Sequence, residues 1–97
     1  MKTLTICGSM RFAEEMKEIA YQLEAQRGYN ILQCVYCDGK PSVEELKALQ
    51  AAHYRKIDLS DGIYVVNIGG YIGESVRKEI EYAAKSGKEI IYHCETH

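Results

Sequence analysis

The sequence predicts an α/β fold in which four parallel strands form one sheet and helices cover both of its faces. Apolar, β-branched segments alternate along the 97 residues with segments whose apolar residues recur at helical spacing. The order is strand, helix, strand, helix, strand, helix, strand, which is typical of a parallel sheet with crossover helices. Because no repeat, low-complexity segment or linker interrupts this pattern, we expect a single domain over residues 1–97.

The four expected strands are short apolar segments bounded by turn-forming residues. In chain order they are Thr3–Cys7, Tyr29–Tyr36, Gly62–Ile68 and Lys88–Cys94. The third of them, "GIYVVNI", is apolar almost throughout, which indicates burial on both faces of the sheet.

Three amphipathic segments between the strands are expected to be helices. The first covers residues 11–26, where apolar side chains recur at i, i+4, i+7 and i+11, and Gly28 is expected to end it. The second opens at Ser42, which stands three residues before a glutamate in the capping-box spacing, and ends near Asp58. The third lies within "NIGGYIGESVRKEIEYA", residues 67–83.

Three segments fall at the carboxyl edge of the predicted sheet, where such sheets bind ligands at the point of strand-order reversal. They are "CGSMR", "CDGKP" and "NIGGYIGES", which follow the first, second and third strands. In the first segment Gly8 and Ser9 lead into a helix that carries Arg11 in its first turn. Backbone N–H groups, a hydroxyl and a guanidinium form a phosphate or anion cradle, although a Gly-Ser pair here is equally an ordinary helix N-cap.

The net charge and the distribution of apolar residues argue against two classes of partner, nucleic-acid polymers and membranes. The net charge of −2 gives no basic footprint for a nucleic-acid polymer. No apolar run approaches the roughly 20 residues that span a bilayer, and the N-terminal "MKTLTICGSM" lacks the apolar length of a signal peptide. We therefore expect a cytoplasmic protein with no membrane or nucleic-acid partner, whose small core favours a homodimer.

The four cysteines include one C-x-x-C pair, formed by Cys34 and Cys37, beside Cys7 and Cys94. A zinc finger needs further ligands at similar spacing, and a thioredoxin-like pair stands at a helix N-terminus, whereas a turn follows this pair. We therefore interpret the cysteines as reduced structural thiols, with Cys7 an ordinary strand-packing residue. A redox or metal module built on the C-x-x-C pair is the alternative.

Glu79 stands beside the apolar stripe of the third expected helix. At about 100° per residue it lies roughly 60° from Val76, between the core face and the solvent face. A carboxylate on this shoulder is half shielded, and the nearby helix N-terminus favours its ionised form. Such a group suits attack on, or stabilisation of, a sugar carbon with oxocarbenium character. The alternative is a surface ion pair with a lysine or arginine.

Three segments, "ICGSMRF", "KIDLSDGIYVVNIGG" and "KEIEYAAKSGKEIIY", resemble the nucleoside 2-deoxyribosyltransferase superfamily and, within it, the small deoxynucleoside 5′-monophosphate N-glycosidases. The resemblance implies that Glu79 is the nucleophile that takes the deoxyribosyl group from the base. It also implies that Gly8, Ser9 and Arg11, which match the Gly-Ser-x-Arg loop of the glycosidases, hold the 5′-phosphate.

The sequence also departs from the pattern of this superfamily. Glu81 stands where the family has glycine, and "GGYIGES" replaces the Asp-Ser-Gly-Thr loop of the transferases. The family's aspartate that assists the leaving base aligns near His53, with Asp58 about one turn later. A histidine at this place either donates a proton to the departing base or is a satisfied core residue.

Taken together, these patterns predict a small flavodoxin-like, Rossmann-like three-layer domain that binds a nucleotide or nucleoside. The expected reaction is cleavage or exchange of the N-glycosidic bond of a (deoxy)nucleoside 5′-monophosphate, without metal or organic cofactor; the alternative is a non-catalytic binder or sensor of a nucleotide-derived ligand. The candidate catalytic residues are Glu79, His53 and Asp58. The candidate substrate-binding residues are Gly8, Ser9, Met10, Arg11, Asn67, Gly69, Gly70, Tyr71 and Ser75.

Overall fold

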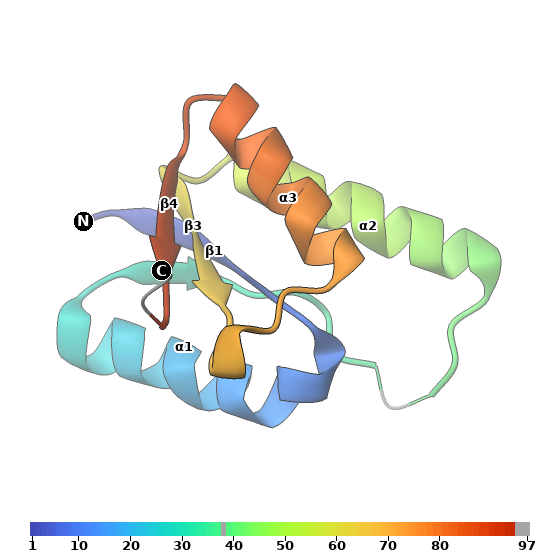
Figure 1. Ribbon diagram of the computed structural model, residues 1–97, viewed down its shortest axis with the longest axis horizontal. Helices are drawn as coiled ribbons and strands as arrows, with labels where there is room; N and C mark the ends of the chain where they lie inside the picture. Colours follow the sequence, from blue (N-terminus) through green and yellow to red (C-terminus); the bar gives the residue numbers. More distant parts are fainter. Residues whose placement is uncertain (38, 95–97) are drawn as a thin grey trace.

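The computed structural model describes residues 1–37 and 39–94 and has a four-stranded, all-parallel sheet in the order β2-β1-β3-β4 (Figure 1). The elements in chain order are β1 (Thr3–Gly8), η1 (Met10–Phe12), α1 (Ala13–Arg27), β2 (Asn30–Leu32), α2 (Val43–Asp58), β3 (Gly62–Val66), η2 (Ile68–Gly70), α3 (Glu74–Lys85) and β4 (Glu89–Tyr92). The predicted α/β class, the parallel sheet and the three helices are therefore confirmed.

The sheet is the middle of three layers, with α1 on one face and α2 and α3 on the other (Figure 1). Alternate side chains of β1 face opposite layers. Leu4 and Ile6 pack with α1, whereas Cys7 belongs to the core cluster beneath α2 and α3. In β3 the burial that the sequence predicted on both faces is observed, since Ile63, Val65 and Val66 are all buried.

Two of the predicted helix ends are confirmed by their capping geometry. Gly28 ends α1 in the left-handed conformation, with φ of 74°, and its N–H bonds the carbonyl of Leu23. At the start of α2 the hydroxyl of Ser42 accepts a hydrogen bond from the N–H of Glu45, whose carboxylate accepts one from the N–H of Ser42.

Three of the four strands are shorter than the sequence predicted, most of all β2, whereas β1 extends one residue further, to Gly8. We expected β2 to run from Tyr29 to Tyr36, but it pairs with β1 only over Asn30–Leu32. β3 ends at Val66 instead of Ile68, and β4 covers Glu89–Tyr92 instead of residues 88–94. β2 is an edge strand with one neighbour, so the chain after it is free to leave the sheet although its residues remain apolar.

The early departure of β2 opens the carboxyl edge of β1. β1 continues to Gly8 against β3, while residues 33–37 and 39–42, here called the β2–α2 loop, arch away from the sheet. β1 also marks the reversal of strand order, because β2 lies on one side of it and β3 on the other. Within the described chain, no helix has the combination of length and apolar character that a membrane span requires.

Candidate functional site

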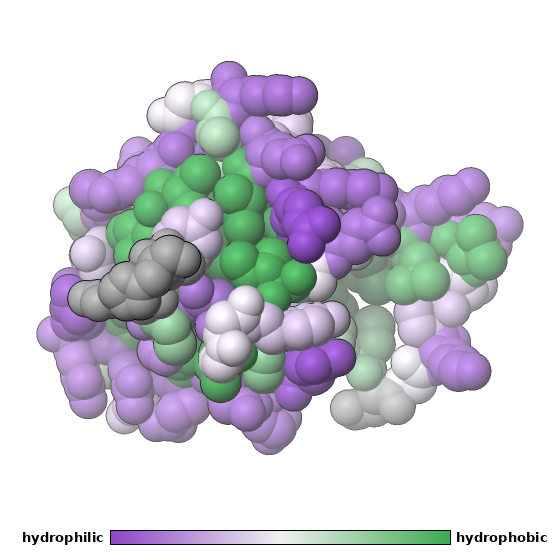
Figure 2. Space-filling model, viewed as in Figure 1, coloured by the Kyte–Doolittle hydropathy of each residue, from purple (hydrophilic) through white to green (hydrophobic). Residues whose placement is uncertain are grey.

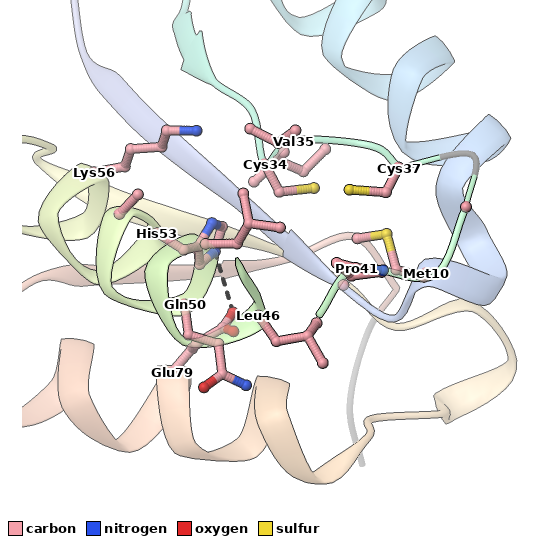
Figure 3. A pocket seen from close by; sticks show the side chains of 15 residues that line it. Met10, Cys34, Val35, Cys37, Pro41, Leu46, Gln50, His53, Lys56 and Glu79 are labelled. Atoms are coloured by element: carbon pink, nitrogen blue, oxygen red, sulfur yellow. Dashed lines mark ion pairs between the residues drawn. The ribbon is translucent and has the colours of Figure 1, made fainter. Parts of the chain in front are cut away.

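A cavity of about 390 Å³ lies at the carboxyl edge of β1, between the β2–α2 loop and α2 (Figure 3). Its size is in the usual range for small-molecule sites. Most of its wall is apolar, and one carboxylate, one imidazole and one ammonium group reach it. The residues that line it are Ile6, Gly8, Met10, Cys34, Val35, Cys37, Gly39, Pro41, Leu46, Leu49, Gln50, Ala52, His53, Lys56 and Glu79.

Glu79 extends from the second turn of α3 to the wall of this cavity. Its side chain is 15% exposed, and Oε1 lies 3.2 Å from Nε2 of His53, whose side chain is 11% exposed (Figure 3). The half-shielded position that helical periodicity predicted is therefore observed. The partner is a buried histidine of α2, and the surface lysine or arginine of the alternative interpretation is not among the ion pairs of the described residues.

His53 faces inward, as its place on the apolar stripe of α2 predicted. Its Nε2 is close to both Glu79 and Cys7, at 3.2 Å and 3.5 Å respectively. Its Nδ1 is buried and has no hydrogen-bond partner among the described residues. The ring is therefore held against the sheet by one nitrogen only, which is fewer polar contacts than a buried imidazole usually makes.

Cys7 is the third member of this group, and the sequence interpretation of it as plain strand packing missed its polar neighbours. Cys7 is 1% exposed, and its sulfur, a nitrogen of His53 and an oxygen of Glu79 all lie within 4.8 Å of one another. Burial, together with the negative charge and hydrogen bond of Glu79, raises the pKa of the Cys7 thiol well above its ordinary value. We call these residues the Cys7–His53–Glu79 cluster. One feature of the sequence could have indicated this position of Cys7. Side chains alternate along β1, so Cys7 and Ile6 face opposite sides of the sheet.

The first loop contributes two of its predicted binding residues to the cavity wall, Gly8 and Met10. A side chain at Gly8 would require neighbours to shift, because a Cβ there would lie 2.9 Å from Sδ of Met16 and 3.1 Å from Cβ of Val66. Ser9 caps η1 and accepts a hydrogen bond from the N–H of Arg11, so the N-cap interpretation of the Gly-Ser pair is observed.

Arg11 and Tyr71, both predicted binding residues, lie against each other beside this loop. The guanidinium carbon of Arg11 is 3.8 Å from the centre of the Tyr71 ring, which also packs edge-on against Phe12. Both side chains are exposed, and neither lines the cavity. Within the described chain Arg11 forms no ion pair. Its charge is therefore available to an anion that lies over the loop.

The remaining residues predicted after β3 do not line the cavity. Asn67 is fully buried, and its side-chain amide exchanges two hydrogen bonds with the backbone of Cys94, so it anchors the end of β4. Gly69 and Gly70 form an exposed turn with φ of 66° and 81°. Ser75 is exposed in the first turn of α3.

Asp58 does not reach the cavity either. It is the last residue of α2, which runs from the carboxyl edge of the sheet back to the start of β3. Its carboxylate accepts a hydrogen bond from the hydroxyl of Tyr82, and its carbonyl accepts one from Lys88. Asp58 lies five positions after His53, which places it about 140° around the helix and about 7.5 Å further along the axis.

The C-x-x-C pair lies on the β2–α2 loop, where Cys34 and Cys37 line the opposite wall from Glu79 (Figure 3). All four cysteines are free thiols. Burial raises the pKa of Cys34, which opposes the thiolate that a redox or nucleophilic role requires. Sequence reasoning also missed Lys56, which lines the cavity and donates to the carbonyl of Gln33.

The cavity thus combines a shielded carboxylate held by an imidazole, an apolar wall and an adjacent loop whose Arg11 guanidinium has no ion-pair partner among the described residues. This set can bind an anionic, partly apolar small molecule and present a nucleophile to it. No protein-family model matches the chain, and neither a curated protein nor a solved structure matches it.

Proposed function

We propose that the protein cleaves or exchanges the N-glycosidic bond of a (deoxy)nucleoside 5′-monophosphate, with Glu79 as the nucleophile. One observation carries the proposal: the Glu79 carboxylate is 15% exposed, is held by His53, and lies on a cavity that the first loop also lines. The resemblance to the nucleoside 2-deoxyribosyltransferase superfamily supplies the reaction class. Shielded carboxylates next to a sugar-sized cavity are what such chemistry uses.

In the proposed mechanism Glu79 attacks the anomeric carbon of the bound sugar. A carbon–oxygen bond forms while the carbon–nitrogen bond breaks, and the base leaves with the electron pair and takes a proton from water. Water then hydrolyses the glycosyl ester, which releases the sugar phosphate and restores the carboxylate; a second base in place of water gives exchange. We assign His53 the positioning of Glu79, because Nε2 lies 3.2 Å from Oε1.

The phosphate is proposed to lie over the first loop. The Arg11 guanidinium has no carboxylate partner among the described residues, and the Ser9 hydroxyl lies two residues before it in the same loop. The contact with Tyr71 holds the guanidinium in place, so less side-chain entropy is lost on binding.

The departure from the family pattern at Glu81 does not obstruct this site. Glu81 is exposed on the outer face of α3, two residues from Glu79 and about 200° around the helix. Its charge therefore lies in solvent and away from the cavity wall.

The test uses Glu79→Ala, with Glu81→Gln on the same helix as the matched control. Each protein is incubated with a panel of ribo- and deoxyribonucleoside 5′-monophosphates, and free base is measured by chromatography. We expect Glu79→Ala to fall to the background rate of base release while it still binds the monophosphate, and Glu81→Gln to keep the wild-type rate. Release at the native rate by Glu79→Ala would remove the assigned role.

The same assay decides between the enzyme and a non-catalytic binder or sensor. A thermal shift with a monophosphate but no free base from the wild-type protein would favour the binder. That outcome would leave the cavity as a nucleotide site and withdraw the nucleophile.

We further propose that two copies associate through the end of α2 that projects beyond the sheet. Hydrophobic surface shows on this end of the molecule (Figure 2), where Val43 and Leu46 of α2 are exposed. Met10 and Val35, which line the cavity together with Leu46, are exposed as well. Exposed apolar residues that gather on one part of a surface are candidates for an interaction site. A second copy would cover it.

A further inference from the structure

The side chains of the Cys7–His53–Glu79 cluster converge from β1, α2 and α3 on one place beside the cavity. Nε2 of His53 faces both the Glu79 carboxylate and the Cys7 sulfur, but a ring nitrogen carries either one proton or one lone pair. If it donates to Glu79, it cannot also accept from the thiol. The thiol can then donate to the Glu79 carboxylate or to the carbonyl of Thr5, which lies 3.8 Å from the sulfur. The three groups therefore point at one place, and among the described residues Nδ1 of His53 has no hydrogen-bond partner.

We propose that Cys7, His53 and Glu79 bind a divalent metal ion of the zinc class. Tetrahedral Zn²⁺, with bonds of about 2.3 Å to sulfur and about 2.0–2.1 Å to nitrogen and oxygen, sets its S and N ligands about 3.5 Å apart and its N and O ligands about 3.3 Å apart. The corresponding separations in the cluster are 3.5 Å and 3.2 Å. The third side of the triangle is within 4.8 Å.

The donor set selects the kind of metal. A thiolate, an imidazole and a carboxylate suit Zn²⁺ and its close relatives, whereas Mg²⁺ and Ca²⁺ prefer oxygen ligands only. The two anionic ligands balance the charge of a divalent ion, so the buried site is neutral when loaded. Three protein ligands leave the fourth coordination position of the metal open. Because Glu79 lines the cavity, this open position faces the cavity, as in zinc sites that accept a ligand.

Binding a metal has a direct consequence for the cavity. The ion occupies the carboxylate that the proposed glycosidase needs as a free nucleophile, so metal loading and base release exclude each other. This consequence rests on the proposed function, but the metal site itself does not. Metal binding is therefore measured without substrate.

The test is a titration of the reduced, metal-free protein with Co²⁺, whose thiolate charge-transfer band in the near ultraviolet reports a Co–S bond. We expect one Co²⁺ per chain and displacement of the band by Zn²⁺. Cys7→Ser should lose the band. Glu79→Gln should bind at least about tenfold more weakly, since even outer-sphere changes cost 10–100-fold. Glu81→Gln is the matched control and should bind like wild type.

The C-x-x-C pair provides the competing source of a Co–S bond, and the variants Cys34→Ser and Cys37→Ser test it. We expect both to keep the band. The proposal is overturned if wild type shows no band, if the band follows Cys34 or Cys37, or if Glu79→Gln binds as tightly as wild type. Because Cys7 is buried, Cys7→Ser is checked by circular dichroism; if it fails to fold, the comparison of Glu79→Gln with Glu81→Gln decides.

Discussion

The two halves of α2 carry the same apolar stripe but differ in what lies opposite it. In the second half, residues 51–58, His53 and Ile57 are buried against the sheet. In the first half, residues 43–50, no residue is buried, and Val43 and Leu46 are exposed at 63% and 46%. The helix projects beyond the sheet there (Figure 1). Periodicity thus identifies a face of a helix, while the neighbouring layer decides whether that face becomes core, cavity wall or contact surface.

The largest expected difference between the halves is in stability. Ile57 is fully buried, and Ile57→Ala should lower the free energy of unfolding by about 2–5 kcal/mol, because it leaves a cavity under the helix. Leu46→Ala, on the projecting half, should cost less than about 1 kcal/mol. Urea unfolding at low protein concentration measures both. Equal losses would mean that the projecting half is packed in solution. If Ile57→Ala does not fold, Ile57→Val should cost about 0.5–1.5 kcal/mol.

A smaller effect is expected on association. Val43→Asp places a charge on the exposed stripe and should weaken the proposed homodimer at least tenfold, or about 1.4 kcal/mol. Aspartate in the first turn of a helix is favourable, so the fold should be retained. Analytical sedimentation at several protein concentrations measures the change in the dissociation constant of the dimer. Tyr21→Asp, at an exposed site on α1 on the other face of the sheet, is the control and should leave association unchanged. A dimer that survives Val43→Asp is held by another surface.

The smallest effect concerns the start of the projecting half, which depends on its cap because it has little packing. Ser42→Ala removes the acceptor for the N–H of Glu45 and should cost about 1 kcal/mol. Ser75→Ala, in the first turn of α3 with no cap hydrogen bond, should stay within about 0.5 kcal/mol. Unfolding followed by circular dichroism compares the two. A loss near zero for Ser42→Ala would show that the first turn is held by other contacts.

The candidate site was only partly predictable from the sequence. The shielded position of Glu79 and the inward direction of His53 follow from helical spacing, which is a local property of each helix. Their contact does not, since it depends on how α2 and α3 lie over β1. Asp58 shows the same limit. It follows His53 by about one turn of α2, yet its carboxylate bonds the hydroxyl of Tyr82 and does not reach the cavity.

The sequence by itself determined the element order, the parallel sheet, the helix caps and the two faces of β3. These follow from spacing and from capping chemistry over a few residues. Only the tertiary structure decided that β2 stops at Leu32, and with it that a cavity opens beside β1. It also decided that Cys7, His53 and Glu79 meet. The physical reason is that both outcomes depend on which distant segments of the chain lie next to each other. The position where a strand stops pairing and the place where side chains meet are set by these neighbours. Residue spacing along one segment does not encode them.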